Sequence, residues 1–331
     1  MTARVRLLLA AIGLAVSVGI VVWVVRYQPF GPPEPMGTPL PSDAVAATGW
    51  TDAGEAPFAR LEMATAVLDG RFWLAGGFDP DGSVADALAI FDPASGDWTE
   101  GPTLPVPIHH AAMVSDGVVL YLVGGYLASG QPTPDVYVLD PVAGEWTAGS
   151  PLPEARAAGA MAHDGERLVY AGGVGPGGVR GEVLALEGEA WVELGMLERP
   201  REHLAAASDG EGRVWVMGGR QGGLDRNVGD VELVHGMSVE LVASLTPRGG
   251  VAAFFAPGTG ACLTGGEAPS FALTTVECVD AGGRATAFPS MHQPRHGHGA
   301  GVVDGVAYAL LGGDVPGLDA TPTVEMLRLN N

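Results

Sequence analysis

The feature that most constrains the fold is a pair of adjacent glycines that recurs six times along the chain. Successive pairs begin 48, 48, 46, 47 and 47 residues apart. A short stretch rich in β-branched and aromatic residues precedes each pair, and a second such stretch follows it. An internal period of 20 to 50 residues indicates a repeat architecture. We interpret the following glycines as structural: Gly76, Gly77, Gly124, Gly125, Gly172, Gly173, Gly218, Gly219, Gly265, Gly266, Gly312 and Gly313.

Each repeat predicts four short strands joined by turns that contain Gly, Pro and Asp. No segment of the repeat region shows the 3.6-residue apolar period of an amphipathic helix. Because one small sheet cannot bury both of its faces, neighbouring sheets must cover each other around an axis. The repeats therefore predict an all-β fold, a six-bladed β-propeller that spans residues 48–331.

The two ends of the repeat region complement each other. The last repeat stops after its third strand, at residues 324–329, so its outer strand is missing. The segment 49–54 (GWTDAG) matches residues 97–101 (DWTEG), which form the outer strand of the next repeat. We therefore expect the N-terminal segment to pair as the outer strand of the last blade. This pairing closes the ring and leaves no unpaired sheet edge.

Several of these motifs resemble those of kelch-repeat propellers. They are the double glycines, the tryptophans that follow some of them, and the sequence PRHGH at residues 294–298. The resemblance covers nearly all of residues 48–331 and implies a propeller fold. It does not specify a function, because propellers host binding, scaffolding and catalysis alike.

The N-terminus predicts a membrane anchor. Two arginines precede an uncharged run at residues 7–25, which is long enough to cross a bilayer as a helix. We assign residues 1–6 to the cytoplasm, 7–26 to a transmembrane signal-anchor helix and 27–47 to a proline-rich linker. A cleaved signal peptide is the alternative, although no small-residue cleavage site directly follows the run. Both interpretations place the propeller outside the cytoplasm, in the periplasm or at the cell surface, or secreted after cleavage.

The charge of the chain excludes two classes of partner. The formal net charge is −21, and all 17 basic residues are arginine. Nucleic acids and anionic lipid headgroups need clusters of positive charge, which the repeat region lacks. The absence of lysine, together with abundant alanine, glycine and arginine, suggests a bacterial source with a GC-rich genome.

An arginine column predicts the ligand site. Five repeats carry Arg 16 or 17 residues before the first glycine, and the second repeat has Ile108 there, followed by two histidines. This position is the entry to the innermost strand, so we expect a ring of side chains at the channel mouth. The resemblance adds that some kelch domains engage ligands with arginine at this position. In the alternative interpretation these arginines pair with loop carbonyls or acids such as Asp79, Glu267 or Asp314. The predicted ligand-binding residues are Arg60, His109, His110, Arg156, Arg201, Arg248 and Arg295.

Histidine and cysteine are side chains in this sequence that could bind zinc or copper. Histidines occur at the strand entries of several repeats, at positions 109, 110, 203, 292, 296 and 298. A zinc site needs three or four ligands within tetrahedral reach, and no carboxylate or cysteine is spaced to complete such a set. We therefore expect neither a metal nor a cofactor.

The two cysteines lie on neighbouring predicted strands of the fifth repeat. If the strands pair so that the residue numbers of partners sum to 540, Cys262 lies opposite Cys278. A disulfide would fit an oxidising compartment. The alternative is a pair of buried small apolar side chains.

The sequence thus predicts an extracytoplasmic binding module that recognises a protein partner or a glycan, with an anionic ligand favoured by the arginines. We expect no catalysis. The alternative is a carbohydrate-active enzyme, because six-bladed kelch propellers include a sialic acid mutarotase. In that case Glu202 beside Arg201, or Glu267, would carry out acid–base chemistry.

Overall fold

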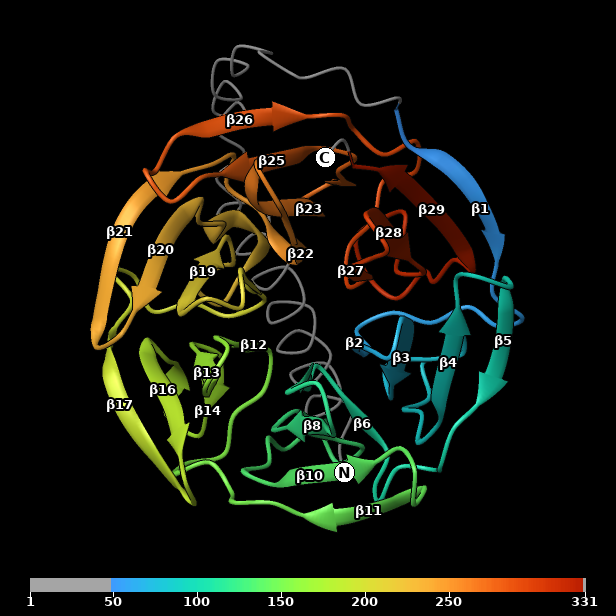
Figure 1. Ribbon diagram of the computed structural model, residues 1–331, viewed down its shortest axis with the longest axis horizontal. Helices are drawn as coiled ribbons and strands as arrows, with labels where there is room; N and C mark the ends of the chain where they lie inside the picture. The colour runs from blue at the N-terminus through green and yellow to red at the C-terminus, as the bar shows by residue number, and fades with distance from the viewer. Residues whose placement is uncertain (1–48, 330–331) are drawn as a thin grey trace, which may run out of the picture. The chain divides into compact units, whose positions relative to one another are not determined.

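The computed structural model describes residues 49–329, which form six antiparallel sheets arranged in a ring (Figure 1). The prediction of an all-β six-bladed propeller is confirmed. Each sheet is one blade, and we name its strands a to d from the central channel outward. Within residues 49–329 no helix is long and apolar enough to cross a membrane. The predicted anchor and linker, residues 7–26 and 27–47, lie outside the described residues.

Each of the first three blades is built from one continuous stretch of the chain. Blade one consists of β2 (Ala64–Leu68), β3 (Arg71–Ala75), β4 (Leu88–Asp92) and β5 (Asp97–Glu100). Blade two consists of β7 (Ala112–Ser115), β8 (Leu120–Val123), β10 (Val136–Asp140) and β11 (Glu145–Ala148). Blade three consists of β12 (Ala160–His163), β13 (Leu168–Ala171), β16 (Glu182–Glu187) and β17 (Ala190–Met196).

The last three blades complete the ring. Blade four consists of β18 (Ala205–Ser208), β19 (Arg213–Met217), β20 (Asp230–His235) and β21 (Ser238–Ser244). Blade five consists of β22 (Gly249–Ala256), β23 (Gly260–Ala268), β25 (Val276–Val279) and β26 (Ala285–Phe288). Blade six consists of β27 (Gly299–Val303), β28 (Val306–Leu310), β29 (Thr323–Arg328) and β1 (Thr51–Glu55).

Short elements lie in the b–c and d–a connections on one face of the ring, with β6 in a d–a connection and the others between strands b and c. They are β6 (Ile108–His109) paired with β9 (Tyr126–Leu127), the hairpin of β14 (Val174–Gly175) and β15 (Gly178–Val179), the 3₁₀ turn η1 (Leu224–Arg226), and β24 (Phe271–Ala272). In a four-stranded antiparallel blade, the b–c and d–a connections leave from the same end. We call this side of the propeller the loop face.

Burial explains why the inner and outer strands of a blade differ in residue type. Strand b lies between two neighbouring blades, so it is apolar on both faces: Leu168–Ala171 and Val306–Leu310 are buried throughout. Strand d lies at the rim and is largely exposed, as in Asp97–Glu100. Apolar clusters join adjacent blades rather than filling one sheet; one of them combines Phe72 and Phe91 of blade one with Tyr308 of blade six.

The N-terminal strand closes the ring as the sequence predicts. Strand β1 pairs antiparallel with β29, with Thr51 opposite Met326 (Figure 1). Trp50 is buried and packs in one cluster with Leu327. Its indole N–H donates a hydrogen bond to the carbonyl oxygen of Pro289 in blade five, at 2.8 Å.

The same tryptophan contact recurs in other blades. The Trp146 indole donates to Pro102 O of blade one at 3.2 Å, and the Trp191 indole donates to Ser150 O of blade two at 2.9 Å. In each case an outer-strand tryptophan binds the chain that follows the outer strand of the preceding blade. Trp50 therefore occupies the equivalent position in blade six, although it is the first of these residues in the sequence.

The glycine pairs hold neighbouring blades together. In the first five pairs the N–H of the second glycine donates to a carbonyl oxygen of the next blade, at 2.7–2.9 Å, and in the sixth repeat the N–H of Gly312 does so, at 3.0 Å. A Cβ at the first glycine would clash with that same carbonyl in several blades; at Gly76 it would lie 2.1 Å from Ile108 O. The sixth pair corrects the sequence alignment. Its two left-handed residues are Leu311 and Gly312, with φ of 56° and 91°, rather than Gly312 and Gly313.

A disulfide links Cys262 of β23 to Cys278 of β25. The two residues are direct partners in the antiparallel register, which is the register with an index sum of 540. Both are fully buried, next to Phe254 and Trp50, in the cluster that joins blades five and six.

Candidate functional site at the channel mouth

Six equivalent residues form the innermost layer of the loop face, one per blade at the entry to strand a. We call them the mouth ring: Glu62, His110, Ala158, His203, Gly250 and Gly297. Each has a left-handed backbone, with φ between 52° and 63°. The N–H of each donates to the carbonyl oxygen of its counterpart in the preceding blade, at 2.7–3.0 Å, so that six hydrogen bonds form a closed circle. The backbone therefore fixes where these six side chains begin.

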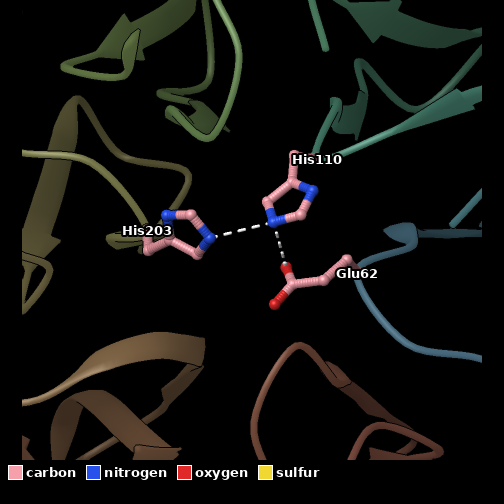
Figure 2. A group of neighbouring side chains, drawn as sticks. All are labelled: Glu62, His110 and His203. Carbon is pink, nitrogen blue, oxygen red and sulfur yellow. Dashed lines mark hydrogen bonds and ion pairs between the residues drawn. The ribbon is translucent and has the colours of Figure 1, made fainter. Parts of the chain in front are cut away.

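Three polar side chains of the mouth ring converge (Figure 2). His110 Nε2 lies 2.9 Å from His203 Nε2 and 3.3 Å from Glu62 Oε2. The three side chains are only 11–14% exposed. The other members of the ring are alanine and two glycines, which leave space beside this group. We call Glu62, His110 and His203 the mouth cluster.

A row of aromatic rings borders the mouth cluster on the loop face. His109 is stacked on Tyr126, with ring centroids 5.3 Å apart, and its other neighbour is Phe78 at 4.1 Å. All three rings are half-buried. His109 Nδ1 lies 2.6 Å from His110 Nδ1, so the row is linked to the cluster by a hydrogen bond.

On the other side, one guanidinium holds two carboxylates. Arg220 Nε donates to Glu202 Oε1 at 3.0 Å, and its Nη1 donates to Glu267 Oε1 at 2.6 Å. The second oxygen of Glu202 contacts Nδ1 of His203. Three carboxylates thus surround the mouth, with one arginine to balance them, and the mouth favours a cation or a neutral group over an anion.

Burial keeps the histidines of this region neutral. It is the main reason why the pKa of His110 is lowered and that of His203 is lowered well below its ordinary value. The pKa of His109 falls to about 4, again chiefly through burial, with repulsion from His110 as the second cause. At neutral pH these imidazoles are therefore uncharged, and each has one ring nitrogen free to act as a ligand or hydrogen-bond acceptor.

The space at the channel mouth is small. A cavity of about 100 Å³ lies at the mouth ring, and a second of about 140 Å³ lies below it between the innermost strands. Alanine and glycine dominate the lining of the deeper cavity. Small-molecule sites have volumes of roughly 300–1,000 Å³. The channel therefore suits an ion, water or a single side chain, and is too small for a whole sugar ring.

The arginine column occupies a different place from the mouth cluster. The side chains of Arg201, Arg248 and Arg295 have no exposed surface, and each contacts a glutamate at the same place in strand c of its own blade. Those glutamates are Glu232, Glu277 and Glu325.

The other two arginines are also paired within their blades. Arg60 binds Asp79 at 3.0 Å, as the alternative interpretation proposed, and Arg156 binds Glu182 at 3.1 Å. The structure thus encloses these guanidinium groups within the blades instead of presenting them at the mouth. Ligand binding by these five arginines stays a prediction, whereas their pairing with blade carboxylates is observed.

Of the predicted site residues, His109 and His110 do lie at the mouth. Sequence reasoning missed Glu62 and Arg220, and it judged that no carboxylate could complete a histidine set. Glu62 completes one because it lies in another repeat, so that sequence spacing within a repeat could not reveal it. The available signal was the column two residues after the arginine position, which reads Glu, His, Ala, His, Gly, Gly through the six repeats.

A buried histidine below the mouth makes the stability of the propeller depend on pH. His298 Nε2 lies 2.8 Å from Thr264 Oγ1, and burial, followed by the charges of Arg295 and His296, lowers its pKa well below 6.5. The unfolded chain binds a proton at this residue below about pH 6.5, whereas the folded chain does not. The contribution is thus fully present above that pH and is lost as the pH falls.

We expect His298→Gln to reduce this dependence. The free energy of unfolding of the wild type should fall relative to the variant by up to about 1.4 kcal/mol per pH unit below pH 6.5. Urea denaturation of both proteins at pH 7.5, 6.0 and 5.0 measures this difference. A constant difference across the three pH values would contradict the assignment of His298 as a buried neutral histidine.

Comparison with known families agrees with the fold. The kelch motif model matches residues 107–153, which are the second repeat with its d–a entry. No curated protein shows significant sequence similarity to the chain. The match and the six-bladed ring together support a kelch-repeat propeller, and such propellers are generally protein-interaction scaffolds.

Proposed function

We propose that this protein is an extracytoplasmic binding module whose protein partner docks on the loop face, over the channel mouth. The observation that carries the proposal is the half-buried aromatic row of Phe78, His109 and Tyr126 beside an acidic opening. Aromatic side chains of this kind are enriched where partners bind. The surplus of carboxylates fits a partner surface that is neutral or basic.

The size of the channel bears on the sugar-converting alternative. A cavity of about 100 Å³ cannot enclose a sugar ring, so a glycan could only lie across the mouth. In addition, Arg220 fixes both Glu202 and Glu267, the two candidate acid–base groups. These contacts give a structural role to both carboxylates, and we do not propose the enzyme.

A photo-crosslinking experiment tests the docking face. A benzophenone amino acid replaces Tyr126 on the loop face or, as the control, Val142, which is 95% exposed in the c–d turn on the opposite face. In cells that produce the protein, we expect a discrete crosslinked protein from position 126 only. That product should weaken when His109→Ala is added. Equal crosslinking from position 142, or binding and turnover of free sugars by the unmodified protein, would contradict the proposal.

The disulfide supports the extracytoplasmic location and gives a prediction of its own. Its two cysteines are 16 residues apart in the sequence. A crosslink over a loop of this length lowers the entropy of the unfolded chain and so stabilises the fold by about 3 kcal/mol. We expect Cys262→Ala/Cys278→Ala to lower the free energy of unfolding by about that amount, measured by urea denaturation without reductant. Reduction of the wild-type protein should have a similar effect. Alkylation of freshly lysed cells should find both thiols blocked; two free thiols in the native protein would contradict the proposed location.

A further inference from the structure

The mouth cluster has the composition and spacing of a metal site. Two imidazole nitrogens and one carboxylate, from three different blades, place their donor atoms within 4.8 Å of one another. A tetrahedral ion with bonds of about 2.0–2.2 Å has ligand atoms about 3.3–3.5 Å apart. The separations of 2.9 Å between His110 and His203, and of 3.3 Å between His110 and Glu62, are close to this value.

A second set of side chains fixes the outer nitrogen of each histidine. The Nδ1 of His203 contacts the carboxylate of Glu202, which is in turn held by Arg220. The Nδ1 of His110 contacts the Nδ1 of His109 at 2.6 Å. A metal-bound histidine usually donates its other N–H to such a partner, which orients the ring. With the proton of each neutral imidazole on its outer nitrogen, both Nε2 atoms would direct their lone pairs at the same point.

The backbone conformation of the mouth ring also bears on this site. Glu62, His110 and His203 all adopt left-handed conformations, with φ of 55°, 52° and 53°. This conformation costs a non-glycine residue about 1–2 kcal/mol. Blades five and six place Gly250 and Gly297 at the equivalent positions, where glycine accepts the conformation without strain. Ala158 of blade three shares this conformation, so the ring requires it in every blade, and at three of the six positions the chain carries a polar side chain instead of glycine or alanine.

We propose that Glu62, His110 and His203 bind one divalent first-row transition-metal ion, of the zinc or cobalt type, at the mouth of the channel. Two nitrogen donors and one oxygen donor suit such an ion better than calcium or magnesium, which prefer oxygen ligands. Three ligands leave at least one coordination position open toward the cavity of about 100 Å³, which can hold water. The inference goes beyond the proposed docking of a partner and does not depend on it, because the ion is tested alone.

The test titrates the purified full-length chain with Zn²⁺ by calorimetry and with Co²⁺ by visible absorption. We expect one ion per chain and cobalt bands of a site with nitrogen and oxygen donors. His203→Gly removes a ligand while placing glycine in a left-handed conformation, so the fold should persist and affinity should fall more than about 100-fold. Glu202→Gln, which changes the partner of His203 Nδ1 while Arg220 keeps its contact with Glu267, should weaken binding about 10- to 100-fold.

His292→Ala serves as the matched control, because His292 is an exposed histidine outside the mouth ring. It should leave the affinity unchanged. The absence of stoichiometric binding, or equal affinity of the wild type and His203→Gly, would overturn the metal site. Either result would leave the docking proposal untouched, because the crosslinking experiment does not measure metal.

Discussion

Replacing Arg248 with isoleucine should lower the free energy of unfolding by about 3–5 kcal/mol. Arg248 is fully buried, contacts the carboxylate of Glu277 and donates to the carbonyl oxygens of Leu263 and Thr246, both at 3.2 Å. Loss of the guanidinium leaves the buried carboxylate of Glu277 without a counter-charge, and the cost of desolvating that charge lowers the stability of the fold. Urea denaturation of wild type and variant at pH 7.5 measures the loss.

One blade of the propeller already has an apolar residue at the position of Arg248. Blade two has Ile108 at the arginine position, where it is 1% exposed, and strands β8 and β10 of that blade pair in an unbroken register. The double variant Arg248→Ile/Glu277→Leu should therefore recover most of the lost stability, because no charge remains to be desolvated. Arg71→Ala, which breaks the exposed pair with Asp92, should cost less than about 1 kcal/mol. If Arg248→Ile were as stable as Arg71→Ala, the buried pair of Arg248 and Glu277 would contribute no more to the free energy of unfolding than an exposed pair.

The pairing of the column arginines with buried glutamates also determines which variants can test these arginines for ligand binding. Substitution of Arg201 and Arg248 together would leave two buried glutamates unpaired, so a loss of binding could simply reflect unfolding. Any such experiment needs the paired glutamate replaced as well.

Replacing Trp50 with alanine should also cost about 3–5 kcal/mol. Trp50 is 1% exposed, packs against Phe254 with ring centroids 6.4 Å apart, and donates its indole N–H to Pro289 O. The variant leaves a cavity between blades five and six at the point where the ring closes. Because β1 is held by few other buried groups, we expect local opening of blade six as well as lower global stability.

Hydrogen exchange distinguishes these effects. Protection of the amides at residues 51–55 and 323–328 should fall more than protection of blade three in the Trp50→Ala variant. Trp146→Ala is the matched control, since the half-buried Trp146 makes the same indole contact in a blade built from consecutive strands. It should affect blade two without exposing β29. Unchanged protection of β29 in Trp50→Ala would mean that Trp50 does not hold the N-terminal strand in blade six.

The architecture could be predicted from the sequence because each of its causes is local or periodic. Gly76 and its counterparts recur because a neighbouring carbonyl approaches too closely for a Cβ. The likeness of residues 49–54 to 97–101 revealed the closing strand. The sixth pair was misaligned by one residue because Leu311 accepts a left-handed conformation at a position where the other repeats have glycine.

The candidate site was harder to predict because it combines different residues from equivalent positions. Repetition along the sequence identified the arginines, which five repeats share, and each of them is paired with a carboxylate of its own blade. The mouth cluster breaks the symmetry, since only blades one, two and four place polar side chains in the mouth ring. Whether the histidines of two blades face each other depends on where those blades lie in the ring. The spacing of residues within one repeat gives no information about such contacts.

Three blades place Glu62, His110 and His203 around one point at the channel mouth. Anomalous diffraction from crystals of the full-length chain grown with Co²⁺ would locate an ion bound there. We expect one strong peak about 2.0–2.2 Å from both Nε2 atoms and from the Glu62 carboxylate. No peak at the mouth, or a peak only at surface groups such as His292, would contradict the metal site.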